Sequence, residues 1–130
     1  MRTLFLGLIL TVIFGGAMTV NAQRAQQVSV RINNQKSVMR DRLRIRFVAV
    51  EDSRCPQDAN CIWAGNAKVT IRVTTGRGQS RTFDLNTNLK DKSARFDGYE
   101  ITLGTVTPYP ASNVRINRNG YTASFTIRKL

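Results

Sequence analysis

The sequence predicts an all-β protein, an antiparallel two-layer β-sandwich of the immunoglobulin-like kind. Apolar and polar residues alternate with period two from Gln27 onward, and no later segment keeps an apolar 3.6-residue period for three turns. Turn residues separate the alternating segments, and seven or eight short strands in about a hundred residues are typical of such sandwiches. A small closed β-barrel is the alternative architecture.

The alternation is clearest in three segments. Val28, Val30 and Ile32 are separated by polar residues, and the same pattern occurs at 42–47 and 68–73. Later segments of the same kind are RTFDL at 81–85, YEITLGTV at 99–106 and YTASFTIRKL at 121–130. Each segment is expected to form a strand with one face toward the core.

Glycine-containing turns connect these segments. Gly76 and Gly78 lie between two predicted strands, and Asp97-Gly98 and Asn119-Gly120 each separate an apolar segment from the strand that follows. Asp-Gly and Asn-Gly pairs readily adopt the positive φ angles of two-residue hairpin turns. We therefore expect β-hairpins at all three places.

The N-terminal residues have the features of a secretory signal peptide, residues 1–22. Arg2 precedes a long apolar run, and Val20-Asn21-Ala22 supplies the small residues that a signal peptidase recognises. Cleavage after Ala22 would leave one domain, residues 23–130, without a transmembrane segment. A secreted or periplasmic location follows from this prediction, and an uncleaved membrane anchor is the alternative.

The composition argues against several kinds of chemistry. The chain has 20 basic residues, 8 acidic residues and no histidine, which gives a formal net charge of +12. The commonest general base, the commonest metal ligand and every Ser-His or Cys-His nucleophile are therefore missing. We expect no catalytic residue, no metal site and no cofactor. A hydrolase that uses Glu51 and Asp52 is a distant alternative, because neighbours on a strand point to opposite faces.

The segment EDSRCPQDANCIWAG, residues 51–65, contains both cysteines of the chain. In an exported protein two cysteines most simply form one disulfide, so we predict a Cys55–Cys61 bond that closes a short local loop. The oxygen-bearing side chains around it could bind a hard cation such as calcium, or they could form turns by bonding to nearby backbone groups, which is the interpretation we favour. These side chains are Glu51, Asp52, Asp58, Asn60 and Asn66.

The basic residues follow the strand pattern. Arg42, Arg44 and Arg46 are spaced by two along one predicted strand, and Lys68 and Arg72 have the same phase on another. If both strands belong to one sheet, these side chains form a cationic stripe on its solvent face. Arginine binds phosphate, sulfate or carboxylate groups with two hydrogen bonds. The alternative is an ordinary solvated face that discourages aggregation.

Trp63 and Gly65 follow the second cysteine closely. We expect Trp63 to pack on the core beside the disulfide, because Ile62 and Trp63 lead directly into a predicted strand. An exposed aromatic anchor is the alternative. Gly65 is expected to allow either a positive φ or a close approach of another backbone segment.

These features predict a non-enzymatic binding or structural module. Its basic face would bind anionic polysaccharide, lipid headgroups or an acidic protein. Specific nucleic-acid binding is not expected, because the aromatic residues share the phase of the core. The alternative function is a protease inhibitor that presents the Cys55–Cys61 loop, with Arg54 entering a pocket specific for basic residues.

The loop also resembles a known sequence pattern. Small secreted bacterial proteins of unknown function share a DSRCP-x4-C-x-WAG motif, and this loop is similar to it. The resemblance covers the loop closely and the rest of the chain loosely. It implies a bacterial exported β-rich domain, with no catalytic residue, ligand or partner to transfer. The matching positions are Asp52, Ser53, Arg54, Cys55, Pro56, Cys61, Trp63, Ala64 and Gly65.

Overall fold

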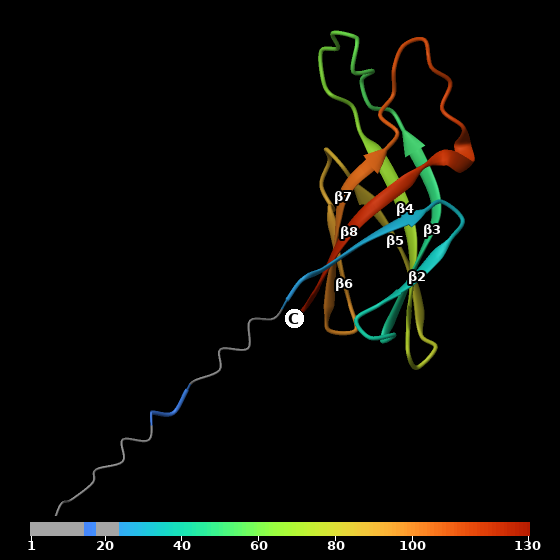
Figure 1. The fold of residues 1–130 in the computed structure, drawn as a ribbon. Helices are drawn as coiled ribbons and strands as arrows, with labels where there is room; N and C mark the ends of the chain where they lie inside the picture. Colours follow the sequence, from blue (N-terminus) through green and yellow to red (C-terminus); the bar gives the residue numbers. More distant parts are fainter. Residues whose placement is uncertain (1–14, 18–23) are drawn as a thin grey trace, which may run out of the picture.

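Two four-stranded antiparallel sheets packed face to face make up the protein (Figure 1). The computed structural model describes residues 15–17 and 24–130, and all strands lie in the second range. The first sheet has the order β1 (Gln26–Arg31), β8 (Thr122–Lys129), β7 (Tyr99–Thr107) and β6 (Ser93–Phe96). The second sheet has the order β2 (Gln35–Val38), β3 (Leu43–Asp52), β4 (Ala67–Thr75) and β5 (Ser80–Asn86).

The predicted antiparallel two-layer sandwich is confirmed. Within residues 24–130 the two sheets stay separate, so the alternative closed barrel is not formed. The predicted signal peptide lies outside the described residues, apart from 15–17. The described ranges contain no helix that is long and apolar enough to cross a membrane.

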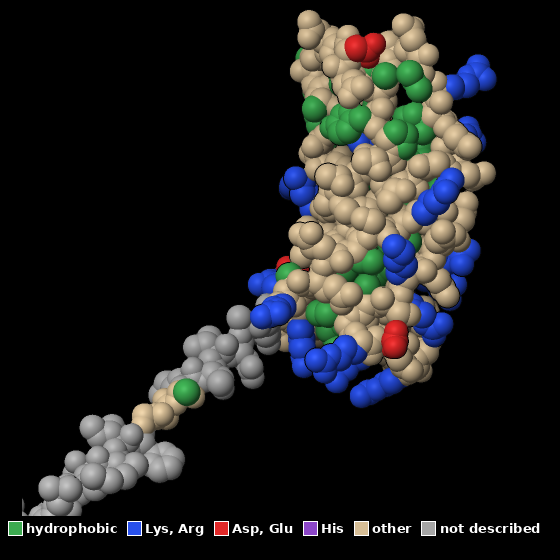
Figure 2. Space-filling model, in the orientation of Figure 1, with side chains coloured by type: hydrophobic (Ala, Val, Ile, Leu, Met, Phe, Trp, Pro, Cys, Tyr) green, Lys and Arg blue, Asp and Glu red, His purple; other side chains and the backbone are tan. Residues whose placement is uncertain are grey.

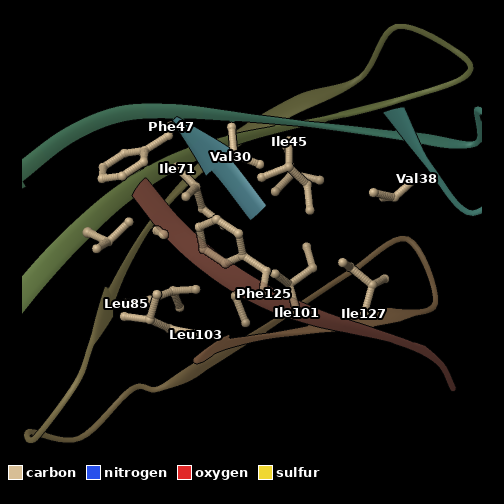
Figure 3. Packing of buried hydrophobic residues seen from close by; sticks show 14 of the residues in the cluster. Val30, Val38, Ile45, Phe47, Ile71, Leu85, Ile101, Leu103, Phe125 and Ile127 are labelled. Atoms are coloured by element: carbon tan, nitrogen blue, oxygen red, sulfur yellow. The ribbon is translucent and has the colours of Figure 1, made fainter. Parts of the chain in front are cut away.

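The hydrophobic core fills the space between the two sheets (Figure 3). Strands β3, β4, β7 and β8 turn every second side chain inward over most of their length. Phe47 of the second sheet and Phe125 of the first are the largest fully buried side chains, and Ile71 and Ile101 belong to the same cluster. Removal of these apolar side chains from water is the main force that holds the sheets together.

Two of the three predicted hairpins are present. β4 and β5 form one around Gly76 and Gly78, and β6 and β7 form another at Asp97-Gly98, where both residues have positive φ (50° and 77°). The hairpin predicted at Asn119-Gly120 is wrong. The chain forms a short 3-10 helix, η1 (Arg118–Gly120), instead. The side chain of Asn117 accepts a hydrogen bond from the Asn119 N–H, and its carbonyl accepts one from the Gly120 N–H.

The connections at the two ends of the sandwich differ in length. The three longest lie at one end, which we call the loop end (Figure 1). They are residues 53–66 between β3 and β4, residues 87–92 between β5 and β6, and residues 108–121 between β7 and β8. The shorter turns that follow β2, β4 and β6 lie at the opposite end.

Strand β2 is not among the strands that the alternation predicts, and it is much shorter than its neighbour β3. Its four residues pair only with Leu43–Arg46. Beyond that point β3 has β4 on one side and no strand on the other. A β-bulge between Phe47 and Ala49 also shifts the register with β4. One edge of the second sheet is therefore open near the loop end.

Candidate functional site

Arg54, in the β3–β4 loop, lies at the centre of the loop end with its side chain only 1% exposed. Its Nε and Nη2 donate hydrogen bonds to the two carboxylate oxygens of Asp52, both at 2.8 Å. Its Nη1 and Nη2 also donate to the carbonyl oxygens of Val106 (2.6 Å) and Pro108 (2.9 Å). The guanidinium carbon lies 4.3 Å from the centre of the Tyr109 ring. One side chain therefore joins the loop after β3 to the segment after β7.

Asp52, at the end of β3, has a further partner in the β7–β8 loop, directly before β8. The Tyr121 hydroxyl donates a hydrogen bond to Asp52 Oδ2 at 3.0 Å. Burial alone would raise the pKa of Asp52, but hydrogen bonds from Arg54 and Tyr121 outweigh it and hold this pKa below its usual value. Burial, together with the hydrogen bond to Asp52, raises the pKa of Tyr121 to about 12. Asp52 is therefore ionised and Tyr121 neutral at physiological pH.

Other contacts connect the two long loops into one unit. The predicted disulfide, Cys55–Cys61, is present with an S–S distance of 2.08 Å. Asp58 Oδ1 accepts hydrogen bonds from both the N–H and the hydroxyl of Ser112. The Gln57 N–H donates to the Pro110 carbonyl at 2.9 Å. The β3–β4 loop is thus closed on itself and bonded to the β7–β8 loop through Arg54, Gln57 and Asp58.

The third connection of the loop end is joined through Gly65 and Asn66. The side chain of Asn88 donates to the Gly65 carbonyl at 2.7 Å, and the side chain of Asn66 contacts the Asn88 N–H and the Asn86 side chain. Gly65 has a φ of 74°, and a Cβ there would collide with the Ser53 carbonyl oxygen. Gly65 therefore has both of its expected roles, a positive φ and a close backbone approach.

The burial of Arg54 corrects one part of the protease-inhibitor hypothesis. The guanidinium is bonded to Asp52 and to two carbonyl oxygens, so it is not available to enter a protease pocket. The role that the sequence analysis gave Arg54 in this hypothesis is therefore wrong. The loop exposes other side chains instead.

Trp63 is 53% exposed and Ile62 is fully exposed, so the expectation that Trp63 packs on the core is also wrong. The reason is that β4 begins only at Ala67, and the positive-φ Gly65 turns the chain before the strand starts. The inward alternation of β4 does not extend back to Trp63. Tyr109 of the neighbouring loop is 53% exposed as well, and Figure 2 shows hydrophobic side chains on the surface of the loop end.

The acidic side chains near Cys55–Cys61 form hydrogen bonds or ion pairs with other groups of the protein. The Asp52 carboxylate accepts hydrogen bonds from the backbone N–H and from the guanidinium of Arg54. The bond from the backbone N–H is a turn-forming contact of the expected kind. Glu51 forms an exposed ion pair with Lys68 at 3.2 Å, whereas Asp52 is paired with Arg54. The two neighbouring carboxylates therefore have different partners. In the described part of the chain, no group of three or more His, Cys, Asp or Glu side chains is placed to hold a metal ion.

Three basic residues of the predicted stripe come together on the outer face of the second sheet. Arg46 of β3 is directly opposite Arg72 of β4, and Arg44 lies two residues away on β3. All three are exposed and line one shallow hollow of about 300 Å³. Among residues 24–130, none of them forms an ion pair. We call Arg44, Arg46 and Arg72 the arginine cluster, and the hollow is also lined by Gln35, Thr74 and Ser80.

The other two residues of the predicted stripe lie apart from this cluster. Arg42 precedes β3 and lines hollows at the opposite end of the sandwich, with Tyr99 and Lys129 of the first sheet. Lys68 lies four residues before Arg72 on β4 and is paired with Glu51 (Lys68 Nζ to Oε2, 3.2 Å). The structure therefore brings together three of the five residues.

No pattern in the sequence predicted the partners of Arg54. Val106 and Pro108 contribute backbone oxygens, which leave no signal in the identity of a residue. Tyr121 is 69 residues from Asp52, and no local pattern connects the two. Thr74 could have been found, because it continues the outward phase of Arg72 on β4.

Comparisons with known proteins identify no family. No protein-family model matches the chain, and no curated protein or solved structure shows a significant match. Its function is therefore inferred from its own surface and side-chain chemistry.

Replacing Arg54 by Met should destabilise the protein strongly. The substitution leaves the Asp52 carboxylate and two carbonyl oxygens buried without their charged donor. We expect the free energy of unfolding to fall by about 3–5 kcal/mol in urea denaturation. Arg115→Met, at an exposed position of the β7–β8 loop, should change it by less than about 0.5 kcal/mol. Similar losses in both variants would contradict the central role of Arg54.

Replacing both Cys55 and Cys61 by Ser should have a smaller effect. The loop between them is short, so its closure restricts little of the unfolded chain, and we expect a loss of up to about 2–3 kcal/mol in the free energy of unfolding. Circular dichroism should still show the β-sandwich. Complete unfolding of the double variant at room temperature, or free thiols in the purified wild-type protein, would contradict this account.

Proposed function

We propose that the protein is an exported, non-enzymatic binding module that holds anionic polymers through the arginine cluster. The observation that supports this most directly is the register of β3 and β4, in which Arg46 is opposite Arg72. Opposed residues of an antiparallel pair have Cβ atoms about 5 Å apart, and like charges at this position are destabilising. A bound anion would relieve that repulsion, so anion binding would also raise the stability of the folded protein.

The groups around the hollow match sulfate, carboxylate and phosphate chemistry. Each guanidinium presents a planar set of N–H donors that can bond two oxygens of one such group. The side-chain amide of Gln35 adds an uncharged donor beside the arginines. The hydroxyls of Thr74 and Ser80 are hydrogen-bonded to each other at 2.8 Å, so one of the two adds a further donor. An anion in the hollow would therefore meet charged and neutral donors together.

The shape and position of the hollow favour a polymer over a small ligand. It is a shallow depression on an exposed sheet face, whereas small-molecule sites are usually enclosed clefts. The net charge of +12 adds long-range attraction for a polyanion. No aromatic side chain is among the residues that line the hollow, so nucleic-acid bases would have no stacking surface. We therefore favour an anionic polysaccharide as the ligand.

Replacing Arg44, Arg46 and Arg72 by Gln should remove most of the binding to a sulfated polysaccharide such as heparin. We expect the Kd at low salt to rise by at least about tenfold, since a hydrogen bond to a charged group contributes about 1.5–3 kcal/mol. Wild-type binding should weaken as salt increases, because the Debye length falls to about 8 Å at physiological ionic strength. Surface plasmon resonance on immobilised heparin would measure both effects.

A charge-matched variant separates the cluster from the general effect of net charge. Lys90, Lys92 and Arg115 are exposed in other loops, and their replacement by Gln removes the same total charge. This control should lose much less affinity than the cluster variant at equal stability. Equal losses would mean that the arginine cluster acts only as generic positive charge.

A protease inhibitor is a second candidate function, and the rigidity of the disulfide loop favours it. The Cys55–Cys61 bond and the Asp58 to Ser112 contacts hold this loop, so it would lose little conformational entropy on binding. Ile62, directly after Cys61, is the most exposed large apolar residue among those that the structure describes. Apolar side chains of the loop would then enter the protease in place of Arg54.

If the protein is such an inhibitor, it should inhibit at least one protease in a panel that covers every catalytic class. The double substitution Ile62→Ser and Trp63→Ser should abolish this inhibition, because it removes the exposed apolar contacts. Leu130→Ser, which changes an exposed apolar residue at the opposite end, is the control. Lack of inhibition across the panel, or full inhibition by the double variant, would exclude this function.

A further inference from the structure

The open edge of β3 offers backbone hydrogen-bonding groups that no strand uses. β2 pairs with β3 only as far as Arg46, and the N–H and C=O of Phe47 are bonded to the β1–β2 turn at Asn33 and Asn34. Residues Val48 to Asp52 continue beyond that turn with β4 on their other side. This part of β3 is about 13 Å long, at about 3.3 Å per residue.

The ladder with β4 shows which groups face the open side. In an antiparallel pair, residues alternate between those bonded to one neighbour and those that face away from it. The Ser53 N–H donates to the Asn66 carbonyl at 2.8 Å, which places Ser53, Glu51 and Ala49 on the β4 side. The N–H and C=O of Val50 and Asp52 therefore face the open edge. In the described residues, no other backbone group bonds to them there.

A groove of about 620 Å³ runs along this edge. One side is the edge of β3 from Val48 to Asp52, and Ile32 of the β1–β2 turn lies among the lining residues. The other side is formed by the segment before β8, including Ile116 and Arg118. Val48 is 41% exposed, so the groove presents apolar surface as well as free backbone groups.

We propose that this groove binds an extended peptide segment of another protein by β-strand addition. The peptide would pair with Val50 and Asp52 and occupy the position that a longer β2 would have filled. Backbone bonding of this kind gives affinity, and pockets for alternate side chains give selectivity. An open strand edge is otherwise a site of aggregation, and soluble proteins generally cover or interrupt such edges.

The walls of the groove limit what can bind there. The segment that contains η1 lines the groove together with β3, so it flanks the open edge and would obstruct the edge of a second sandwich more than a single extended segment. Arg118 is exposed and forms no ion pair within residues 24–130, so it favours a peptide with an acidic side chain or a terminal carboxylate. The Asp52 carboxylate is already bonded to Arg54 and Tyr121 and would not oppose this.

The test uses a phage-displayed library of random linear heptapeptides, selected on the full-length folded protein in high salt. High salt screens contacts with the arginine cluster, which lies on the outer face of the sheet, so the result is independent of polysaccharide binding. We expect enriched peptides to alternate apolar residues. An acidic residue in such a peptide should add affinity when binding is measured again at low salt, where the charge of Arg118 is less screened. On binding, the amides of Val50 and Asp52 should become protected from hydrogen exchange, while Ala49 and Glu51 are protected in the free protein as well.

A proline variant gives the matched control. Val50→Pro removes an N–H that faces the groove and leaves the β4 ladder intact. Thr82→Pro removes an outward-facing N–H at the opposite edge of this sheet. Asn86 directs its N–H away from β4 to Asp91, and Thr82, four residues earlier on β5, has the same phase. Circular dichroism and thermal melting would verify that both variants fold. Val50→Pro should raise the Kd of an enriched peptide at least about tenfold, and Thr82→Pro should leave it unchanged.

Three outcomes would overturn the proposal. The first is that no peptide is enriched, and the second is that enriched peptides bind the Val50→Pro and wild-type proteins equally. The third is a concentration-dependent dimer that Val50→Pro abolishes, which would make a second copy of this chain the occupant. Arg118→Gln provides a further check that does not alter the backbone, and it should weaken acidic peptides more than neutral ones.

Discussion

The buried ion pair between Arg54 and Asp52 is the interaction on which the loop end depends. A carboxylate can remain ionised away from water only if charged and polar donors replace its hydration, and here Arg54 and Tyr121 do so. The same guanidinium satisfies the carbonyl oxygens of Val106 and Pro108 where β7 ends. The pair therefore determines how two loops leave two different sheets, and the exposed side chains of those loops keep their positions because of it.

The candidate binding surfaces both follow from the construction of the second sheet. β3 and β4 are long and pair over most of their length, which places Arg46 opposite Arg72 on the outer face. β2 is short, which leaves the upper part of β3 open beside the β7–β8 loop. Opposed like charges lower stability, and an open edge invites association. Each feature is unfavourable in an isolated domain and becomes favourable when a ligand covers it.

Prediction succeeded where the deciding contacts are local and failed where they are not. The alternation around Ile45 and Ile71 needs only neighbouring residues to define an inward face, and these side chains are buried as expected. The Asn119-Gly120 pair suits a hairpin, but hydrogen bonds to Asn117 produce a 3-10 helix instead. Trp63 was expected inside because it leads into a predicted strand, but the loop leaves it half exposed because β4 begins four residues later at Ala67.

The sequence by itself determined the all-β architecture, the disulfide between Cys55 and Cys61, and the common phase of the arginines, because each depends on separations of a few residues. Only the tertiary structure decided that Arg54 is buried and that part of β3 is an open edge. Arg54 is buried because the packing of the two sheets brings it against the carbonyl of Val106. Val106 is 52 residues away in the sequence and belongs to the other sheet. The edge is open because β2 begins only at Gln35, after a turn that is bonded to Phe47. Contacts of this kind form only when the two sheets pack together, so no local pattern of residues records them.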